Sequence, residues 1–335
     1  MAAAPATDTS LWTALERLLD RATVDGIRLH KLGAVAGRFR RLRGEPVALQ
    51  LAADERGSAV ALLLAPRVLE RVRSLVDGPL VLIKGPEVAR LYPGRARVFG
   101  DVDLVTPDPW AVQRALLEAG CVEVGDFFED AHHLRPLKWP DLGLKIEVHK
   151  RPSWPKRIPP PPFEELLEAA TPAACGVDGV LAVDPTQHAL ILAAHGWKEN
   201  ALGTLRDLVD VAAVAATLPE HELEHAATAW GLERLWNATR ATTDALLEGR
   251  PLPFPQRAWA RHLESVRERT VLESHLRNWL QGFSKSPPRV AILDLRDALR
   301  RELRPKPGES WRTKLARAAD AARHPRQPSL HDDAR

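Results

Sequence analysis

Two aspartates separated by one residue, Asp101 and Asp103, are the first feature of the sequence that suggests chemistry. The residues between and after them, Val102, Leu104 and Val105, are apolar, which is typical of a strand anchored in a core. Side chains two apart on a strand leave the same face, with Cα atoms about 6.5 to 7 Å apart. Two carboxylates placed in this way can share divalent metal, although an isolated Asp-x-Asp often marks only two solvated charges at a strand end.

A third carboxylate comes from the segment 144–149, in which apolar and polar residues alternate strictly. Alternation on a strand places Glu147 and His149 on one face and the apolar residues on the other. Three acids from two adjacent strands fit a two-metal phosphoryl-transfer site, in which ions about 3.5 to 4 Å apart bridge the carboxylates. The expected ligands of Mg²⁺ or Mn²⁺ are therefore Asp101, Asp103 and Glu147, and His149 is expected in a supporting role at the nucleotide.

A short apolar run over residues 80–83 ends at Lys84 and Gly85. The cation and the approachable backbone amides of this turn suit a triphosphate, and Arg97 is a candidate for clamping it further. The alternative for Lys84 is a charged residue that simply ends a strand, and for Arg97 a solvated loop arginine. We place Lys84, Gly85, Arg97 and His149 in the nucleotide-binding set.

These segments together resemble a known family. The sequence reads Leu-Ile-Lys-Gly to position 85, Leu-Tyr-Pro over 91–93, Gly-Asp-Val-Asp-Leu-Val over 100–105 and Ile-Glu-Val-His over 146–149, with Arg97 between the second and third segments. This pattern resembles the bacterial uncharacterised nucleotidyltransferase family of the DNA polymerase β-like nucleotidyltransferase superfamily, over roughly residues 76–247. The superfamily's usual Gly-Ser turn is absent, and Lys84-Gly85 stands in its place.

The resemblance implies a reaction. It implies a Mg²⁺-dependent nucleotidyltransferase that moves a nucleoside monophosphate from NTP to an acceptor hydroxyl or phosphate. It also implies metal ligation by Asp101, Asp103 and Glu147, with Glu147 as a candidate for activating the acceptor hydroxyl. The partners implied are NTP and an acceptor that is a small molecule, a peptide or RNA.

Hydrophobic periodicity predicts the elements that position these residues. We expect an α+β fold in which a small mixed β-sheet with flanking helices is followed by a mostly α-helical C-terminal domain. Strands or extended segments are expected over 80–83, 101–105, 121–124, 132–137 and 144–149, and helices over 87–91, 110–119, 185–195, 202–217, 220–247, 257–280, 290–303 and 311–323. The predicted division is a helical region over 1–76, the core over 77–157, a Pro-rich linker over 158–162, a helical domain over 163–323 and a disordered tail over 324–335.

Composition narrows the class of protein. The 335 residues are 45% hydrophobic and 27% charged, as in ordinary globular domains. Lys plus Arg total 47 against 44 Asp plus Glu, so the net charge of +3 carries no strong signal for nucleic acid. Two cysteines are too few for a disulfide framework. Without a long apolar stretch or a signal sequence, we expect a cytoplasmic protein that does not enter a membrane.

Two other functions remain open as alternatives. Residues 221–225 read His-Glu-Leu-Glu-His, the HExxH pattern of zinc peptidases, but the segment is polar almost throughout and directly follows Pro219. The second alternative is a catalytically inactive nucleotide-binding or regulatory module with the same fold. Walker A and GxGxxG motifs are absent, which argues against a P-loop kinase and a Rossmann oxidoreductase.

Several polar residues are expected to be structural. His195 lies on an apolar helix face, where a hydrogen-bonded structural histidine is the default interpretation. Arg206, Asp207 and Asp210 have the spacing of helical ion pairs. The pair at 132–133, His-His, is expected in a loop or at a sheet edge.

Overall fold

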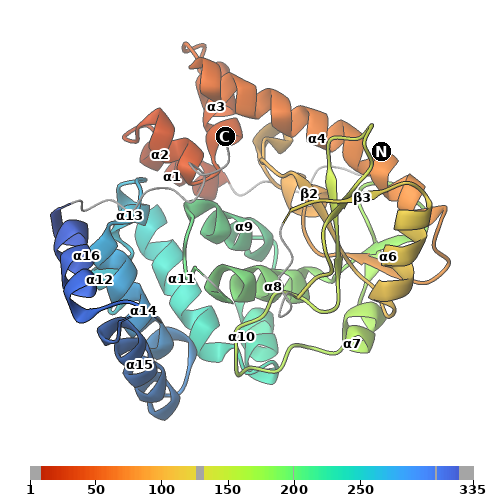
Figure 1. Cartoon of the computed structure of the whole chain (residues 1–335). Coiled ribbons are helices and arrows are strands. Elements are labelled where there is room, and N and C mark those ends of the chain that lie inside the picture. Colours follow the sequence, from red (N-terminus) through yellow and green to blue (C-terminus); the bar gives the residue numbers. More distant parts are fainter. Residues whose placement is uncertain (1–8, 126–131, 199, 306–307, 324–335) are drawn as a thin grey trace.

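A mixed β-sheet forms the centre of the computed structural model, which describes residues 9–125, 132–198, 200–305 and 308–323 (Figure 1). Within these residues the strand order is β3-β4-β5-β2-β1-β7-β6. The central strands β2 and β5 are parallel, β1 is antiparallel to β2, and β1 is parallel to β7. The strands are β1 (Leu80–Leu82), β2 (Asp101–Val105), β3 (Val122–Glu123), β4 (Leu137–Lys138), β5 (Lys145–His149), β6 (Thr171–Pro172) and β7 (Val180–Ala182).

The N-terminal region is helical, and its longest helix packs on one face of the sheet. It comprises α1 (Thr9–Leu19), α2 (Val24–Leu29), α3 (Gly33–Leu42) and α4 (Leu49–Arg73). Ala65, Val68 and Leu69 of α4 join a buried cluster with Leu82 and Ile146 of the sheet. The same cluster takes in α6 (Pro109–Glu118), so α4 and α6 together cover this face.

The opposite face packs on the helices that follow the sheet. Val81, Ile83 and Val105 belong to a second buried cluster that contains Leu190 of α8 (Pro185–Lys198) and Leu208 of α9 (Leu205–Ala215). Because side chains alternate along a strand, the apolar run of β1 serves both clusters, with Leu80 and Leu82 on one face and Val81 and Ile83 on the other. In Figure 1, α8 and α9 lie between the sheet and the C-terminal helices.

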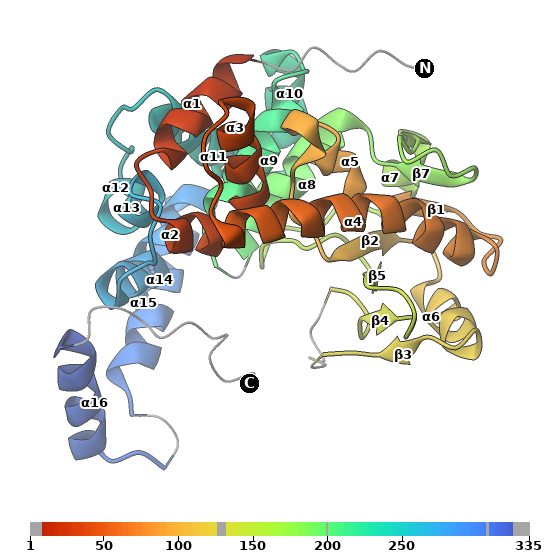
Figure 2. The ribbon, with the colours of Figure 1, turned by 90° about the horizontal axis from the view of Figure 1, so that it is seen from above.

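The remaining helices form the helical C-terminal region that the sequence predicts, although two long predicted helices are interrupted. The helix expected over 220–247 is broken by Gly231, which has a φ of +65°, and the helix expected over 257–280 is three shorter ones. The last helices lie far from the strands (Figure 2). The helices not yet named are α5 (Pro86–Ala89), the 3-10 helix η1 (Pro93–Arg95), α7 (Phe163–Glu168), α10 (Glu220–Ala229), α11 (Glu233–Leu247), α12 (Gln256–Trp259), α13 (Arg261–Glu264), α14 (Val271–Lys285), α15 (Pro288–Leu303) and α16 (Trp311–Arg323).

Two strands beyond the proline run were not predicted. β6 and β7 return the chain to the sheet, and the apolar run that begins at Val180 pairs in parallel with β1. The segment expected to be extended over 132–137 contains only an isolated bridge between His133 and His149 before β4 begins. The domain limits, including the linker over 158–162, stay a prediction, and the tail over 324–335 lies outside the described residues. No described helix is both long and apolar enough to cross a membrane.

Candidate functional site

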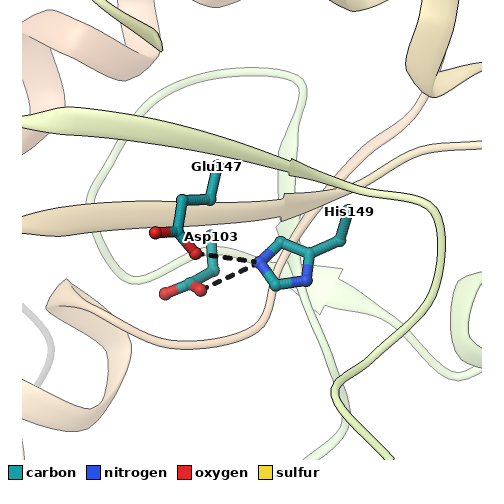
Figure 3. Close-up of side chains that lie close together, drawn as sticks. All are labelled: Asp103, Glu147 and His149. Atoms are coloured by element: carbon teal, nitrogen blue, oxygen red, sulfur yellow. Dashed lines mark hydrogen bonds and ion pairs between the residues drawn. The ribbon is translucent and has the colours of Figure 1, made fainter. Parts of the chain in front are cut away.

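Parallel pairing of β2 and β5 brings the predicted acids together. In the register of this pair Asp103 lies opposite Glu147, and Asp101 lies opposite Lys145. The intervening Val102 is fully buried on the other face, so the strand is anchored while its acids face α8 and α9. Figure 3 shows the carboxylates of Asp103 and Glu147 side by side, each directed toward the imidazole of His149.

His149 bridges the two facing carboxylates. Its Nε2 lies 2.9 Å from Oδ1 of Asp103 and 3.7 Å from Oε2 of Glu147. Burial of the ring would lower the pKa of His149, but hydrogen bonds to Asp103 and Glu147 outweigh burial and raise the pKa. Burial likewise opposes ionisation of Asp103, yet Lys84 and His149 hold its pKa below the usual value. Asp103 and His149 therefore stabilise each other as an ion pair.

The cluster of side chains around Asp103 offers the ligand atoms that a divalent-cation site needs. Ligand atoms of Asp103, Glu147 and His149 lie within 4.8 Å of one another, and Oδ2 of Asp103 is buried without a hydrogen-bond partner among the described residues. Burial raises the pKa of Asp101, and the charges of Asp103 and Glu147 raise it further. Clustered carboxylates that oppose one another's ionisation favour a cation, and their oxygens suit hard ions such as Mg²⁺ and Mn²⁺. The structure thus groups His149 with two of the three predicted ligands.

The Lys84-Gly85 turn lies directly beside the acids. Nζ of Lys84 is 3.7 Å from Oδ1 of Asp103 and 3.1 Å from Nδ1 of His195. Gly85 has a φ of +67°, and a Cβ at this position would lie 3.2 Å from the carbonyl oxygen of Asp101. Glycine is favoured there because a side chain would be strained in this conformation and would press on β2.

Arg97 lines the same cavity but is held by a partner from α9. Its Nε and Nη2 donate to the two carboxylate oxygens of Asp210 at 2.7 and 2.6 Å, and the hydroxyl of Tyr92 donates to Asp210 at 2.7 Å. All three side chains are buried. Burial would raise the pKa of Asp210, but Arg97 outweighs it and lowers the pKa. The expected helical ion pair of Asp210 with Arg206 is long, at 3.9 Å, and the strong partner is Arg97.

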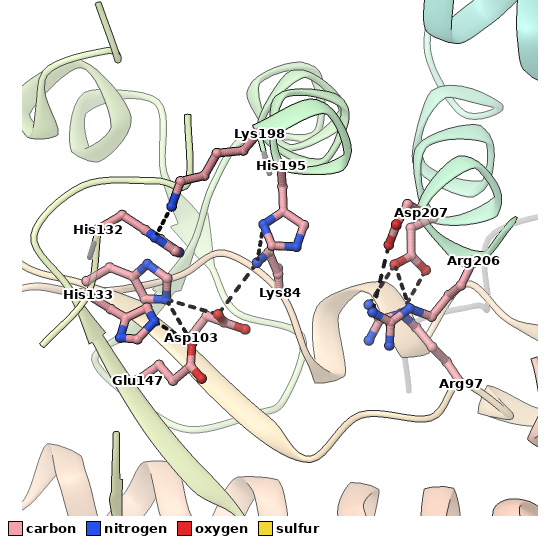
Figure 4. Close-up of polar contacts among 12 residues, drawn as sticks. Lys84, Arg97, Asp103, His132, His133, Glu147, His195, Lys198, Arg206 and Asp207 are labelled. Atoms are coloured by element: carbon pink, nitrogen blue, oxygen red, sulfur yellow. Dashed lines mark hydrogen bonds and ion pairs between the residues drawn. The ribbon is translucent and has the colours of Figure 1, made fainter. Parts of the chain in front are cut away.

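Histidines that sequence reasoning left outside the site surround the acids (Figure 4). Nε2 of His133 lies 3.8 Å from Oε2 of Glu147, and the ring of His132 is 5.1 Å from that of His149. Nζ of Lys198 lies 2.5 Å from Nδ1 of His132. His195 was expected to be structural, but it is partly buried and contacts Lys84 in the site. The sequence predicted structural or loop positions for these histidines, and only the fold brings them to the acids.

All seven predicted site residues lie at one cavity or touch its lining. The cavity encloses about 470 Å³, which is within the usual size of a small-molecule site. Lys31, which carried no signal in the sequence, adds a cation to the wall. The lining comprises Lys31, Lys84, Gly85, Arg97, Val98, Phe99, Gly100, Asp101, Asp103, His132, His133, Glu147, Leu192, His195, Arg206, Asp207 and Asp210; His149 lies behind it against Asp103 and Glu147.

The HExxH segment does not form a comparable centre. His221, Glu222 and His225 are exposed on the surface of α10. Among the described residues, the cluster with metal-ligating geometry is the one on β2 and β5. A catalytic zinc site needs supporting side chains that exclude water and orient its ligands, and the zinc alternative gains no support from the structure.

Comparison with known proteins identifies a family that spans the sheet and the helices around the cavity. A family model described as an uncharacterised nucleotidyltransferase matches residues 10–248, well over half of the chain. The matched range includes every residue that lines the cavity. No curated protein matches the chain.

Proposed function

The chain belongs to the uncharacterised nucleotidyltransferase family, and from this premise we propose that it is a Mg²⁺- or Mn²⁺-dependent enzyme that transfers a nucleoside monophosphate from NTP to an acceptor. The acceptor group is a hydroxyl or a phosphate, carried by a small molecule, a peptide or RNA. The observation that carries the proposal is the pairing of Asp103 with Glu147 across β2 and β5, beside Lys84 and with one carboxylate oxygen unpartnered among the described residues.

In this proposal the acids hold the metal. Asp101, Asp103 and Glu147 are the ligands, in keeping with the two-metal arrangement of phosphoryl-transfer sites. When bound, the divalent ions would neutralise phosphate charge and stabilise the charge on the attacking and leaving oxygens. His149 keeps the two carboxylates in place, because it hydrogen-bonds to Asp103 and lies within ion-pair distance of Glu147. The buried position of Asp103 limits its motion, which preorganises the site.

The remaining residues handle the substrates. Lys84 and the backbone at Gly85 bind the triphosphate, and Arg97 contributes positive charge while it stays paired with Asp210. Glu147, 19% exposed and facing the cavity, accepts the proton of the acceptor hydroxyl. The acceptor oxygen then forms a bond to the α-phosphorus as the bond to pyrophosphate breaks.

Label transfer tests the proposal. The protein is incubated with each α-³²P-labelled NTP, Mg²⁺ and three acceptor pools, namely small metabolites, peptides and RNA. We expect label in one pool with the wild type, and a loss of at least about 100-fold with Asp103→Asn or Glu147→Gln. Glu123→Gln, an exposed acid on β3, is the matched control and retains activity. Equal transfer by wild type and Asp103→Asn would overturn the proposal, whereas nucleotide binding without transfer to any pool would favour the inactive module.

A further inference from the structure

A second cavity lies on the other side of the turn that presents Lys84. It encloses about 260 Å³ and shares no lining residue with the first cavity. It is nevertheless built from neighbouring parts of the same elements, since α8 and α9 contribute to both walls and α5 directly follows Gly85 of the first cavity. The lining comprises Glu87, Arg90, Leu91, Thr171, Pro172, Ala174, Ala182, Val183, Pro185, His188, Val214 and Thr217.

Two buried polar side chains in this wall each leave one atom unsatisfied. Glu87 is 4% exposed and His188 is 6% exposed. Oε1 of Glu87 and Nε2 of His188 make no hydrogen bond of good geometry among the described residues, although the backbone of Ala174 and Cys175 approaches the Glu87 carboxyl. Buried polar groups are nearly always paired, because an unpaired one loses its hydration without compensation. Two such atoms on one small cavity indicate that an occupant supplies their partners.

Both unsatisfied atoms are hydrogen-bond acceptors. The imidazole of His188 bonds to the backbone of Ile83, and burial lowers its pKa to about 4, so the ring is neutral at pH 7. Because Nε2 is unpartnered, the bond to Ile83 belongs to Nδ1, which leaves the lone pair of Nε2 available. Burial raises the pKa of Glu87, although Arg90 opposes the shift. Its carboxylate accepts most strongly from a cationic donor, which would offset the effect of burial. The missing partner is therefore a donor, and an ammonium group suits both atoms.

The rest of the wall specifies the other parts of the occupant. Arg90 donates from Nε to Oε2 of Glu87 at 3.3 Å, and its side chain is 38% exposed at the margin of the cavity. A guanidinium at the margin of the cavity can also bind a carboxylate of the occupant. Ala182, Val183 and Val214 supply apolar surface for a short aliphatic group.

We propose that this cavity is a binding site for a small zwitterion of the size of an amino acid. Its ammonium group bonds to Glu87 and His188, its carboxylate faces Arg90, and its side chain packs on the apolar wall. The site is independent of the nucleotidyl-transfer cavity, although His188 bonds to the residue directly before Lys84.

Calorimetric titration of the full-length protein with glycine, alanine, serine and valine tests this site. We expect at least one of them to bind with a Kd of about 1 mM or tighter. Propylamine and propionate, which each lack one of the two charged groups, should bind at least about tenfold more weakly. Absence of binding by all four amino acids would overturn the proposal and assign the unsatisfied atoms to water.

Matched variants locate the binding. Glu87→Gln keeps the volume of the side chain but removes its charge, and it should weaken the amino acid at least about tenfold. Glu118→Gln, at an exposed position of α6, should leave affinity unchanged. If Glu87→Gln fails to fold, the partly exposed Arg90→Gln serves as the second variant and should weaken the amino acid but not propylamine. Wild-type affinity in both Glu87→Gln and Arg90→Gln would contradict the assignment.

Discussion

Asp103 combines three roles in one side chain. It pairs with His149, lies beside Lys84 and presents an oxygen that has no partner among the described residues. We expect Asp103→Asn to weaken binding of Mn²⁺ at least about tenfold. Loss of a residue that only supports a metal ligand already lowers metal affinity by about this factor, and loss of the charged ligand itself should lower it at least as much. Electron paramagnetic resonance of free Mn²⁺ during titration measures this. Asp141→Asn, an exposed acid, is the control, and unchanged Mn²⁺ affinity in Asp103→Asn would remove Asp103 from the ligand set.

His188 gives the protein a pH-dependent component of stability. Burial lowers its pKa from 6.5 to about 4 in the folded state. Below pH 6.5 the unfolded chain therefore binds a proton that the folded chain does not, so this stability is present above pH 6.5 and is lost toward pH 4. Between pH 7 and pH 5 the loss from this residue is roughly 2 kcal/mol.

Urea denaturation at the two pH values measures this contribution. The free energy of unfolding of His188→Gln should fall by roughly 2 kcal/mol less than that of the wild type between pH 7 and pH 5. Comparison of the two differences cancels the effects of other titrating groups. An identical fall in the two proteins would show that His188 is protonated in the folded state.

Among the elements, the turn between β1 and α5 is sensitive to a single added methyl group. Gly85→Ala should lower the free energy of unfolding by about 1–3 kcal/mol, because the residue keeps a positive φ only at the cost of strain. It should also reduce nucleotide transfer, since the added Cβ presses on the backbone of Asp101. Gly78→Ala, where a Cβ meets no atom within 4 Å and which lies outside the cavity lining, is the matched control. Equal stability of the two variants would indicate that the turn adapts.

The strands of the site could be predicted because their pattern is local. Alternation over 144–149 and the apolar residues around Asp101 and Asp103 are enough to place three acids on two strands, and the structure has both strands. The partners of those strands could not be predicted, since the register of β2 and β5 is a long-range property. β7 has only three residues, too few to separate a strand from a turn by periodicity.

Contacts between distant segments account for the residues that sequence reasoning placed elsewhere. The histidines at 132–133 come to the acids through the bridge between His133 and His149, and no local pattern encodes that bridge. Arg97 was expected at the phosphates, but its tight partner Asp210 lies 113 residues later in the chain. Separations of this size carry no periodic signal.

At the scale of the whole molecule, the pair of Arg97 and Asp210 joins the segment before β2 to α9. Asp210→Asn leaves the guanidinium of Arg97 buried without a charged partner of equal strength, and should lower the free energy of unfolding by about 3–5 kcal/mol. Asp54→Asn is the control, because its partner Arg28 is 46% exposed, and should cost no more than about 1 kcal/mol. Chemical denaturation measures both, and equal losses would mean that the buried pair does not join these elements.

The most direct test of the central claim follows the α- and γ-phosphates of one nucleotide separately. With the acceptor pool that takes up label, wild-type protein is supplied with NTP labelled at either the α- or the γ-phosphate. Nucleotidyl transfer predicts that α-label appears on the acceptor and γ-label appears in pyrophosphate, with both signals reduced at least about 100-fold in Asp103→Asn. Transfer of γ-label to the acceptor, or full α-label transfer by Asp103→Asn, would contradict the assignment of these acids to nucleotidyl transfer.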